Sequence, residues 1–259
     1  MSAGKVLIIL SDAHSFPLIR PDGTVQQEES GFFLSELSKP LTRILDAGYS
    51  VTFASPKGRE PNVDPLSDSA MLAFFGKWWE KNKANKLIEE MKLQNNLASP
   101  RPFASISDAE LDSFVGVFIP GGHAPLSDLG DDPELGRILW HFHNKRKPTA
   151  ALCHGPYAFL STKHAPGAAG FAYKGYKITS WSNQEEKVVE TAKGGTVPKV
   201  EDALVAEGAE FVSGAAQKLA GSVTIDRELI TGSNPTAADN IGAKFVEALE
   251  AYSSAPAQS

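Results

Sequence analysis

The sequence predicts an α/β domain in which helices cover a mostly parallel sheet, and three features of the chain predict it. Short apolar runs rich in branched residues alternate with segments whose apolar residues recur at helical spacing. Of the 259 residues, 42% are hydrophobic, which is enough for a substantial core. Glycine, proline and polar clusters separate the segments. Residues 1–252 are expected to form one domain.

The first strand-helix-strand unit lies near the N-terminus. Residues 5–10 form an apolar run that ends in polar residues, as a buried strand entering a loop does. A loop containing Pro17 follows. Apolar residues then recur at helical spacing over residues 33–45, and Gly48 can cap this helix in the left-handed conformation. Residues 50–54 are predicted to form the next strand, parallel to the first.

The same alternation resumes in the second half of the chain. Strands are expected at 114–119 and 149–152, with a helix over 132–144 between them, and another helix begins at His154. Small and polar residues indicate a disordered tail at 253–259. Later elements are expected as short strands at 177–180, 210–213, 222–225 and 229–231 and a closing helix over 237–251.

Residues 57–101 interrupt this alternation and are interpreted as an inserted, mainly helical cap segment over one end of the sheet. A charged segment of helical character runs through residues 74–93. It includes Trp78 and Trp79, a pair that either lines a pocket or partner surface or, more commonly, anchors an inserted helix to the body.

Composition and charge exclude several classes of partner and compartment. A formal net charge of -6 and a pI near 5.6 give no reason to expect nucleic acid, because phosphate binding draws on clustered lysine and arginine. No apolar run approaches the ~20 residues that cross a bilayer, and no charged-then-apolar leader follows Met1. A cytoplasmic protein without membrane contact is expected, and a single cysteine can form no intrachain disulfide.

A candidate nucleophile lies at the end of a predicted strand. Residues 149–156 pass from the strand through Cys153 and His154 to a glycine and a proline that open the next helix. A sharp turn there would present the sulfur at the carboxyl end of the sheet. The positive end of the following helix would favour a thiolate and lower the thiol pKa. Otherwise Cys153 is a small buried hydrophobe, and His154 only fills the turn.

Two further features carry candidate chemistry. The glycines in Pro-Gly-Gly-His allow close backbone approach, so the amides of Gly121 and Gly122, with that of His154, are candidates for an oxyanion hole. On its own, Pro-Gly-Gly is merely a turn signal. Glu36 lies within an apolar face of the first helix. If buried, it would have a raised pKa and exchange protons near neutral pH; if exposed, it would do neither.

Taken together, these motifs resemble the PfpI superfamily, the flavodoxin-like group that includes the parkinsonism-associated deglycase, intracellular proteases and glyoxalase III enzymes. The resemblance is strongest to the heat-shock chaperone/glyoxalase III branch and implies a flavodoxin-like, class I glutamine amidotransferase-like domain. It implies that Cys153 is a functional thiol. The matching segments, in order, are 31–40, 47–49, 53–58, 64–65, 120–123, 151–156 and 231–235.

The resemblance implies a Cys-His-acid triad beside a separate glutamate. Cys153, His154 and Glu36 take three of these places by motif position. The triad acid should follow the strand at 177–180. Glu185 and Glu186 both qualify there, and spacing from the strand favours Glu186.

No metal and no organic cofactor are expected. Some members of the branch bind zinc through histidine and carboxylate ligands, but His14 and His123 stand isolated in the sequence and complete no such set. The resemblance implies a glutathione-independent glyoxalase III of the D-lactate dehydratase type. Cys153 would add to methylglyoxal, Glu36 would move a proton between its two carbons through an enediol, and the thioester would be hydrolysed to lactate with help from His154.

Other functions remain as alternatives. The aromatic insertion with Phe74, Phe75 and the tryptophan pair favours a holding chaperone that binds unfolded clients. A protein deglycase, or a Cys-dependent amide or isonitrile hydrolase, would use the same Cys-His pair. The expected partners are a small dicarbonyl substrate and a second copy of the chain, since homodimers are common among the proteins it resembles.

Overall fold

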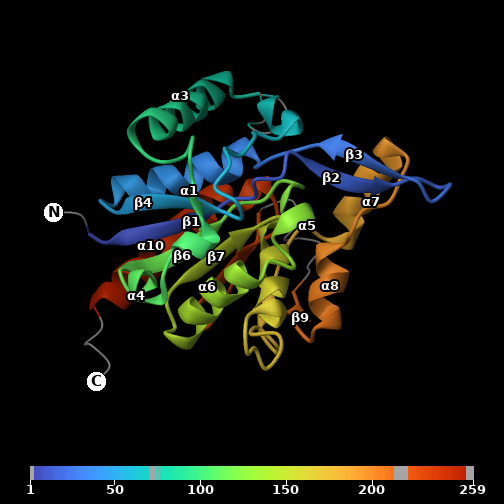
Figure 1. Ribbon diagram of the computed structural model, residues 1–259. Helices are drawn as coiled ribbons and strands as arrows, with labels where there is room; N and C mark the ends of the chain where they lie inside the picture. The colour runs from blue at the N-terminus through green and yellow to red at the C-terminus, as the bar shows by residue number, and fades with distance from the viewer. Residues whose placement is uncertain (1–2, 70–73, 75, 213–220, 255–259) are drawn as a thin grey trace.

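The centre of the molecule is a seven-stranded sheet (Figure 1). The computed structural model describes residues 3–69, 74, 76–212 and 221–254. Within them, the strand order is β10-β11-β7-β6-β1-β4-β5, and only the β10–β11 pairing is antiparallel. This confirms the predicted α/β class. The strands are β1 (Lys5–Ile9), β4 (Ser50–Ser55), β5 (Arg101–Pro102), β6 (Phe114–Ile119), β7 (Thr149–Leu152), β10 (Val223–Asp226) and β11 (Leu229–Gly232).

The inner strands are apolar throughout because both faces of the sheet are covered. Along β1, Val6 and Ile8 point into one layer, and Leu7 and Ile9 point into the other. All four side chains are fully buried. This alternation divides the core into two layers, one on each side of the sheet.

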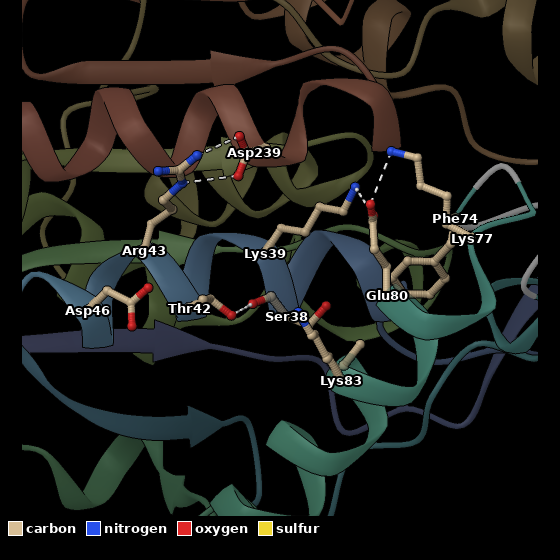
Figure 2. Close-up of a pocket in the computed structure, with 11 residues that line it drawn as sticks. Ser38, Lys39, Thr42, Arg43, Asp46, Phe74, Lys77, Glu80, Lys83 and Asp239 are labelled. Carbon is tan, nitrogen blue, oxygen red and sulfur yellow. Dashed lines mark hydrogen bonds and ion pairs between the residues drawn. The ribbon is translucent and has the colours of Figure 1, made fainter.

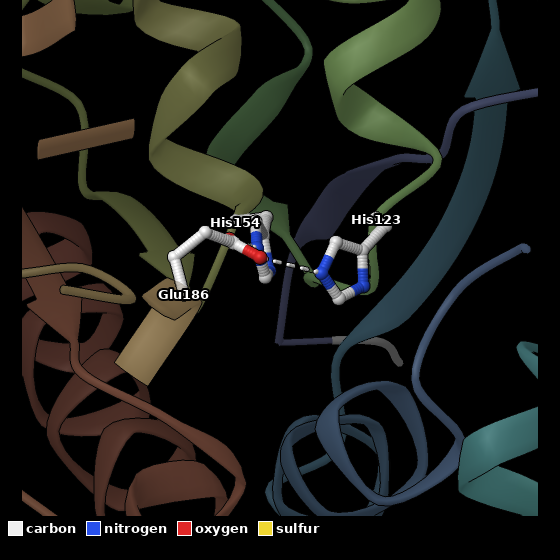
Figure 3. A group of neighbouring side chains, drawn as sticks. All are labelled: His123, His154 and Glu186. Atoms are coloured by element: carbon white, nitrogen blue, oxygen red, sulfur yellow. Dashed lines mark hydrogen bonds and ion pairs between the residues drawn. The ribbon is translucent and has the colours of Figure 1, made fainter. Parts of the chain in front are cut away.

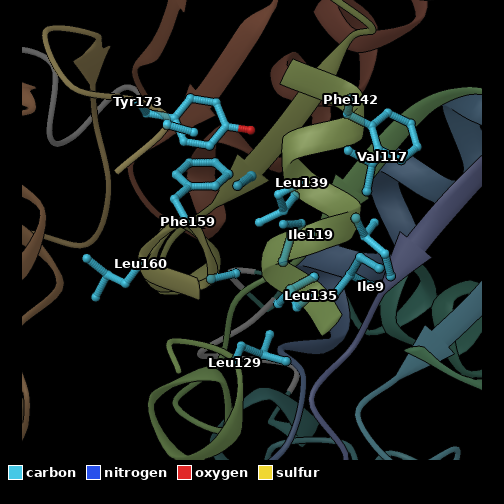
Figure 4. Close-up of a cluster of buried hydrophobic side chains, with 14 of the residues drawn as sticks. Ile9, Val117, Ile119, Leu129, Leu135, Leu139, Phe142, Phe159, Leu160 and Tyr173 are labelled. Carbon is cyan, nitrogen blue, oxygen red and sulfur yellow. The ribbon is translucent and has the colours of Figure 1, made fainter. Parts of the chain in front are cut away.

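One layer lies beneath α6 (Pro133–Asn144) and the 3-10 helix η3 (Gly155–His164) (Figure 4). Leu135, Leu139 and Phe142 of α6 pack with apolar side chains of the sheet and with Phe159 of η3. The short α4 (Asp108–Leu111) and α5 (Pro125–Asp128) border this layer. Deep burial of these side chains fixes the loops that leave β6 and β7.

The other layer lies beneath α1 (Leu34–Asp46) and α10 (Ala238–Ser254). Figure 2 shows the outer side of this layer, where α3 (Trp78–Gln94) packs against α1. Arg43 of α1 pairs with Asp239 of α10 at 2.8 Å, and Lys39 of α1 pairs with Glu80 of α3 at 3.4 Å. A cavity of about 530 Å³ lies among these side chains. The inserted helix therefore covers α1, and not an end of the sheet as the sequence analysis expected.

The tryptophan pair does not anchor the insertion. Trp78 and Trp79 remain 63% and 49% exposed, whereas Phe74, Ala84 and Ile88 are buried in the α1/α10 layer. The more common interpretation of the pair is therefore wrong, because smaller residues on the inner face of the helix make the contact. Phe75, the other aromatic residue of interest, lies outside the described residues.

A β-hairpin occupies the segment that was expected to be a loop. β2 (Ser15–Ile19) and β3 (Val25–Glu29) form an antiparallel ribbon that includes Pro17. It lies beside α7 (Asn183–Lys193), to which Lys193 and Glu28 connect it by a 2.7 Å ion pair (Figure 1). A proline is tolerated here because the ribbon has only two strands and leaves outward-facing positions unpaired.

The remaining elements are short, and β8 (Lys177–Ile178) begins beside the turn between β10 and β11, where the Lys177 N–H donates to Asp226. The predicted strand at 177–180 contains only two strand residues, which pair in a separate small sheet, and the end of the one predicted at 210–213 lies outside the described residues. The closing helix continues to Ser254, so the predicted tail at 253–259 begins as helix, and residues 255–259 lie outside the described part. These elements are β8 (Lys177–Ile178), β9 (Glu210–Phe211), α8 (Val200–Ala206), η1 (Pro65–Asp68), η2 (Phe103–Ser105) and η4 (Pro235–Ala237).

Within the described part of the chain, no helix has the length and apolar character needed to span a membrane.

Candidate active site

Cys153 lies at a strained turn directly after β7. Its φ is 60°, in the left-handed region that residues other than glycine rarely occupy. Neighbouring elements hold the turn on both sides: the Cys153 N–H donates to the Gly232 carbonyl at 3.0 Å, and its own carbonyl accepts from the Trp181 N–H at 2.9 Å. The turn ends β7 and aims the sulfur into a cavity at the carboxyl end of the sheet.

His154 connects the thiol to a carboxylate. Its Nδ1 lies 3.3 Å from the Cys153 sulfur, and its Nε2 lies 2.7 Å from Oε2 of Glu186 on α7. An ionised carboxylate only accepts hydrogen bonds, so Nε2 carries the proton and Nδ1 of the neutral ring is free to take one from the thiol. Burial, and then the neighbouring His123 ring, lower the pKa of His154, which favours this neutral form.

Glu186, and not Glu185, therefore occupies the position of a triad acid. Burial alone would raise its pKa, but His154 and His123 together lower the pKa of Glu186 to about 2. Glu185 turns back along α7, where its side chain accepts from the backbone N–H of Ser182 in a capping box. Sequence spacing had favoured the same glutamate.

His123 is not isolated, contrary to the sequence analysis. Its Nε2 lies 3.2 Å from Oε1 of Glu186, and its ring centroid is 4.1 Å from that of His154 (Figure 3). Phe16 of the hairpin also stacks on the His123 ring, with centroids 4.6 Å apart. The only sequence signal was its place directly after the two glycines. His14 does lie apart, exposed and bonded to the Glu60 carbonyl.

Glu36 comes from the first turn of α1 and is completely buried beside the thiol. One of its oxygens, Oε2, accepts from the Gly121 N–H at 2.9 Å. Burial raises the pKa of Glu36 to about 8, while hydrogen bonds with Cys153 and the Gly121 amide lower it in part. This carboxyl is therefore protonated at neutral pH and can both give and take a proton near it.

The pKa of the Cys153 thiol is not lowered, contrary to the expectation from the sequence. Burial, and then the charge of and hydrogen bond with Glu36, raise the pKa of Cys153 well above its usual range. The element that follows is a 3-10 helix, with poorer alignment of its peptide groups than the expected α-helix. The resting site thus holds a neutral thiol between a protonated carboxyl and a neutral imidazole.

In the resting site, the Gly121 and Gly122 amides that were expected to form an oxyanion hole already have partners. The Gly121 amide is already bonded to Glu36, and the Gly122 amide bonds to the Cys153 sulfur and lowers the thiol pKa. A Cβ atom at Gly121 would lie 2.5 Å from Oε2 of Glu36 and 2.6 Å from Cβ of Cys153. Only glycine fits between the thiol and the carboxyl, so Gly121 sets their separation.

A cavity of about 280 Å³ opens onto the thiol. Apolar side chains form much of its wall, Asp64 and Glu185 contribute carboxyl groups, and neither lysine nor arginine is found among its described lining residues. Such a cavity suits a small, uncharged electrophile. Its lining residues are Phe33, Asp64, Leu66, Gly122, His123, Cys153, His154, Trp181, Glu185, Val189, Asn234, Pro235 and Thr236.

Residues 28–248 match the model of the DJ-1/PfpI family. The protein/nucleic acid deglycase HchA of Pseudomonas aeruginosa (strain UCBPP-PA14) is 26% identical over 215 residues, which cover 80% of this chain and 69% of that protein. HchA of Staphylococcus aureus (strain MSSA476) is 26% identical over 219 residues, with 80% and 68% covered.

Two solved structures share the fold, which is the flavodoxin-like fold that the sequence resemblance implied. Rapid Encystment Protein 24 KDa of Francisella tularensis superposes with a TM-score of 0.76 at 22% identity, over 95% of this chain and 99% of that one. Glyoxalase III of Candida albicans superposes with a TM-score of 0.69 at 20% identity, over 95% and 97%.

Proposed function

This chain belongs to the DJ-1/PfpI family, and from that premise we propose that it is a glutathione-independent glyoxalase III that converts methylglyoxal to lactate. The observation that carries the proposal is the position of the Cys153 thiol, with Glu36 on one side and His154 on the other, at a cavity whose described lining residues include neither lysine nor arginine. A carboxyl buried against a nucleophile serves proton transfer on a small carbonyl compound better than it serves cleavage of a peptide.

The first step joins the sulfur to the aldehyde carbon. Nδ1 of His154 takes the thiol proton as the sulfur attacks, and the protonated carboxyl of Glu36 gives its proton to the aldehyde oxygen. The product is a hemithioacetal, a carboxylate at Glu36 and an imidazolium at His154. The ionised Glu186 beside the ring stabilises that imidazolium.

The second step moves hydrogen between the two substrate carbons. The Glu36 carboxylate removes the proton from the carbon that bears the sulfur, and His154 protonates the neighbouring oxygen to give an enediol. Glu36 then returns its proton to the second carbon, and His154 takes back a hydroxyl proton, which leaves a lactoyl thioester on Cys153. In the last step the Glu36 carboxylate accepts a proton from the attacking water, and the imidazolium of His154 protonates the departing sulfur, which releases lactic acid and restores the thiol, the carboxyl and the neutral imidazole.

The direct test measures lactate formed from methylglyoxal without glutathione. We expect activity in the unmodified protein and a loss of more than about 100-fold in both Cys153→Ala and Glu36→Gln. Glu186→Gln and Glu185→Gln form a matched pair, because only the first removes the acceptor that fixes the His154 tautomer. Full activity in Cys153→Ala or Glu36→Gln would overturn the proposal.

Protein deglycase activity is a second candidate, favoured by the printed names of the HchA relatives. The same thiol would attack the carbonyl carbon of a methylglyoxal adduct on a lysine or arginine side chain. Release of free lysine side chains from a pre-glycated peptide, measured after all free methylglyoxal has been removed, separates this activity from simple depletion of the aldehyde.

A holding chaperone is the third candidate, favoured by the exposed Trp78 and Trp79. It predicts that the protein keeps a heated client soluble and that Cys153→Ala does so equally well. Replacing both tryptophans with alanine should then abolish the protection without changing lactate formation. If Cys153→Ala loses the protection of the client while the double tryptophan variant keeps it, a role of the exposed tryptophans in holding clients is excluded.

A further inference from the structure

The first turn of α1, which carries Glu36, has no cap of its own. Phe33 occupies the N-cap position, and its aromatic side chain makes no hydrogen bond to the backbone N–H groups of that turn. The acceptor comes instead from Ser67, 33 residues later in the chain, whose Oγ accepts from the Leu34 N–H at 2.9 Å. A residue of the insertion therefore caps the helix that bears the proposed acid.

The Ser67 hydroxyl is oriented so that its oxygen can accept from α1. Its own proton is donated to the Asp64 carbonyl at 2.7 Å, which leaves the lone pairs of the oxygen for the Leu34 N–H. Ser67 is completely buried, so loss of its hydroxyl would leave that N–H as a buried donor without this partner. An unpaired buried donor is costly, and the first turn of α1 would shift to relieve it.

The 3-10 turn η1, which presents Ser67, is fixed independently of that hydroxyl. Oδ1 of Asp64 accepts from the Leu66 N–H at 2.9 Å, and Oδ2 accepts from the Ser30 hydroxyl at 2.6 Å. The Asp64 N–H donates to the Phe32 carbonyl at 2.9 Å. Removal of the Ser67 hydroxyl would therefore release α1 and leave η1 in place. Asp64 and Leu66, which line the substrate cavity, would stay where they are.

Both backbone groups of Gly121 are bonded to the same turn of α1. The Gly121 carbonyl accepts from the Phe33 N–H at 3.0 Å, and the Gly121 N–H donates to Oε2 of Glu36 at 2.9 Å. A shift of this turn would therefore change the distance from the Glu36 carboxyl to the Gly121 amide and to the thiol beside it. A misplacement of about 1 Å can slow catalysis by about 100-fold.

We propose that Ser67 is a positioning residue for Glu36. Ser67 is not among the residues that line the substrate cavity, so it acts through the helix, by holding the first turn of α1 against Gly121. Its effect on catalysis rests on the proposed function, because it requires that Glu36 transfers protons. The cap itself does not depend on that chemistry.

Amide hydrogen exchange, followed by NMR on the intact protein, tests the cap. Val200, the first residue of α8, is a matched comparison, because Lys199 at the N-cap of that helix makes no side-chain cap hydrogen bond. We expect the Leu34 N–H to exchange more slowly than the Val200 N–H, and to exchange more than about fivefold faster in Ser67→Ala. Equal exchange at the two positions, or unchanged exchange of Leu34 in folded Ser67→Ala, would overturn the cap.

Lactate formation tests the positioning role. In Ser67→Ala, kcat and kcat/KM for methylglyoxal should both fall by more than about tenfold, because the proton transfers by Glu36 are impaired. KM should change by less than about twofold, because η1 and the cavity wall stay in place. A loss of stability alone would produce no such division between kcat and KM in protein that is folded.

Thr162→Val is the matched control for the loss of a buried hydroxyl. The Thr162 hydroxyl also donates to a carbonyl, that of Phe159 at 2.7 Å, and accepts from an N–H, that of Ala172 at 3.1 Å. It lies near the end of η3 and not on α1 or η1. We expect Thr162→Val to keep the kcat of the unmodified protein. Ser67→Cys is a second test variant. Its sulfur is a weaker acceptor, so kcat should fall without a change in KM, but by less than in Ser67→Ala.

The outcomes separate the cap, the positioning role and the proposed function. Melting temperatures show which variants are folded at the assay temperature. Faster exchange at Leu34 with an unchanged kcat, or an equal loss of kcat in Thr162→Val, would overturn the positioning role. If the unmodified protein forms no lactate, the proposed function is refuted and the role of Ser67 in catalysis with it, whereas slow exchange at Leu34 would still establish the cap.

Discussion

At the scale of single residues, the site is defined by where its protons rest. Glu36 is protonated at neutral pH because burial raises its pKa to about 8, and His154 is neutral because burial lowers its pKa. In the proposed first step, the carboxyl gives a proton and the imidazole takes one. Both groups are therefore in the required state in the resting protein.

These protonation states predict a bell-shaped pH profile for kcat/KM with methylglyoxal. On the acid side, activity should fall only below the ordinary histidine pKa of 6.5, when His154 becomes charged. On the alkaline side, it should fall above about pH 8, by up to about tenfold per pH unit, as Glu36 loses its proton. Rates that instead rise steadily through pH 8 would show that a thiolate or carboxylate form is the active one.

Glu36 also predicts how stability depends on pH. Its pKa is 4.5 in the unfolded chain and about 8 in the fold, so the folded state loses stability as pH rises from about 4.5 towards 8. Glu36→Gln removes this penalty. The free energy of unfolding of Glu36→Gln minus that of the unmodified protein should therefore increase by about 3 kcal/mol from about pH 5 to pH 7, at about 1.4 kcal/mol per pH unit.

Urea unfolding at the two pH values measures this difference. Glu29→Gln, at an exposed position in the hairpin, is the control for loss of a carboxylate and should show no such trend. A constant difference between Glu36→Gln and the unmodified protein at both pH values would contradict the raised pKa.

At the scale of elements, the insertion is attached by the inner face of α3. Ile88 is buried against α1, so Ile88→Ala should cost about 2 to 5 kcal/mol of unfolding free energy. The double change of Trp78 and Trp79 to alanine should cost less than about 1 kcal/mol, because both side chains are largely exposed. Denaturant unfolding compares the two losses of unfolding free energy. A larger loss in the double tryptophan variant would show that the tryptophans anchor the insertion.

Elements with a strong local sequence pattern could be predicted from the sequence. Elements that depend on pairing with another segment of the chain could not. β1, β6 and β7 are continuous apolar runs because both sheet faces are covered, and a short window shows this. The hairpin has no such signal: Pro17 lies in β2, and β3 is mostly exposed and polar. Both strands are defined by their pairing with each other and not by their local sequence.

The same distinction applies to the site. Cys153 and His154 are neighbours in sequence, and the turn after an apolar strand marks them. His123 meets Glu186, 63 residues later in the chain, only because the fold brings the segment after β6 against α7. The raised pKa of the Cys153 thiol could not be predicted from the local turn either. It arises from burial and from Glu36, which lies on α1, far earlier in the chain.

At the scale of the whole molecule, charge separates the two enzymatic candidates. The protein carries a net charge of -6, and the described residues that line its cavity include Asp64 and Glu185 but neither lysine nor arginine. Methylglyoxal is neutral and feels this field weakly, whereas a glycated peptide of net positive charge is drawn towards it. The dependence of each reaction on salt therefore reports which substrate the molecule's field assists.

We expect kcat/KM for methylglyoxal to change by less than about twofold as ionic strength rises from about 0.01 M to 0.15 M, where screening shortens from about 30 Å to 8 Å. For a cationic glycated peptide, kcat/KM should fall several-fold over the same range, and Glu185→Gln should weaken that fall. If peptide turnover is insensitive to salt, the carboxylates at the cavity do not attract the peptide. Deglycation would then have no electrostatic advantage over the reaction with the free aldehyde.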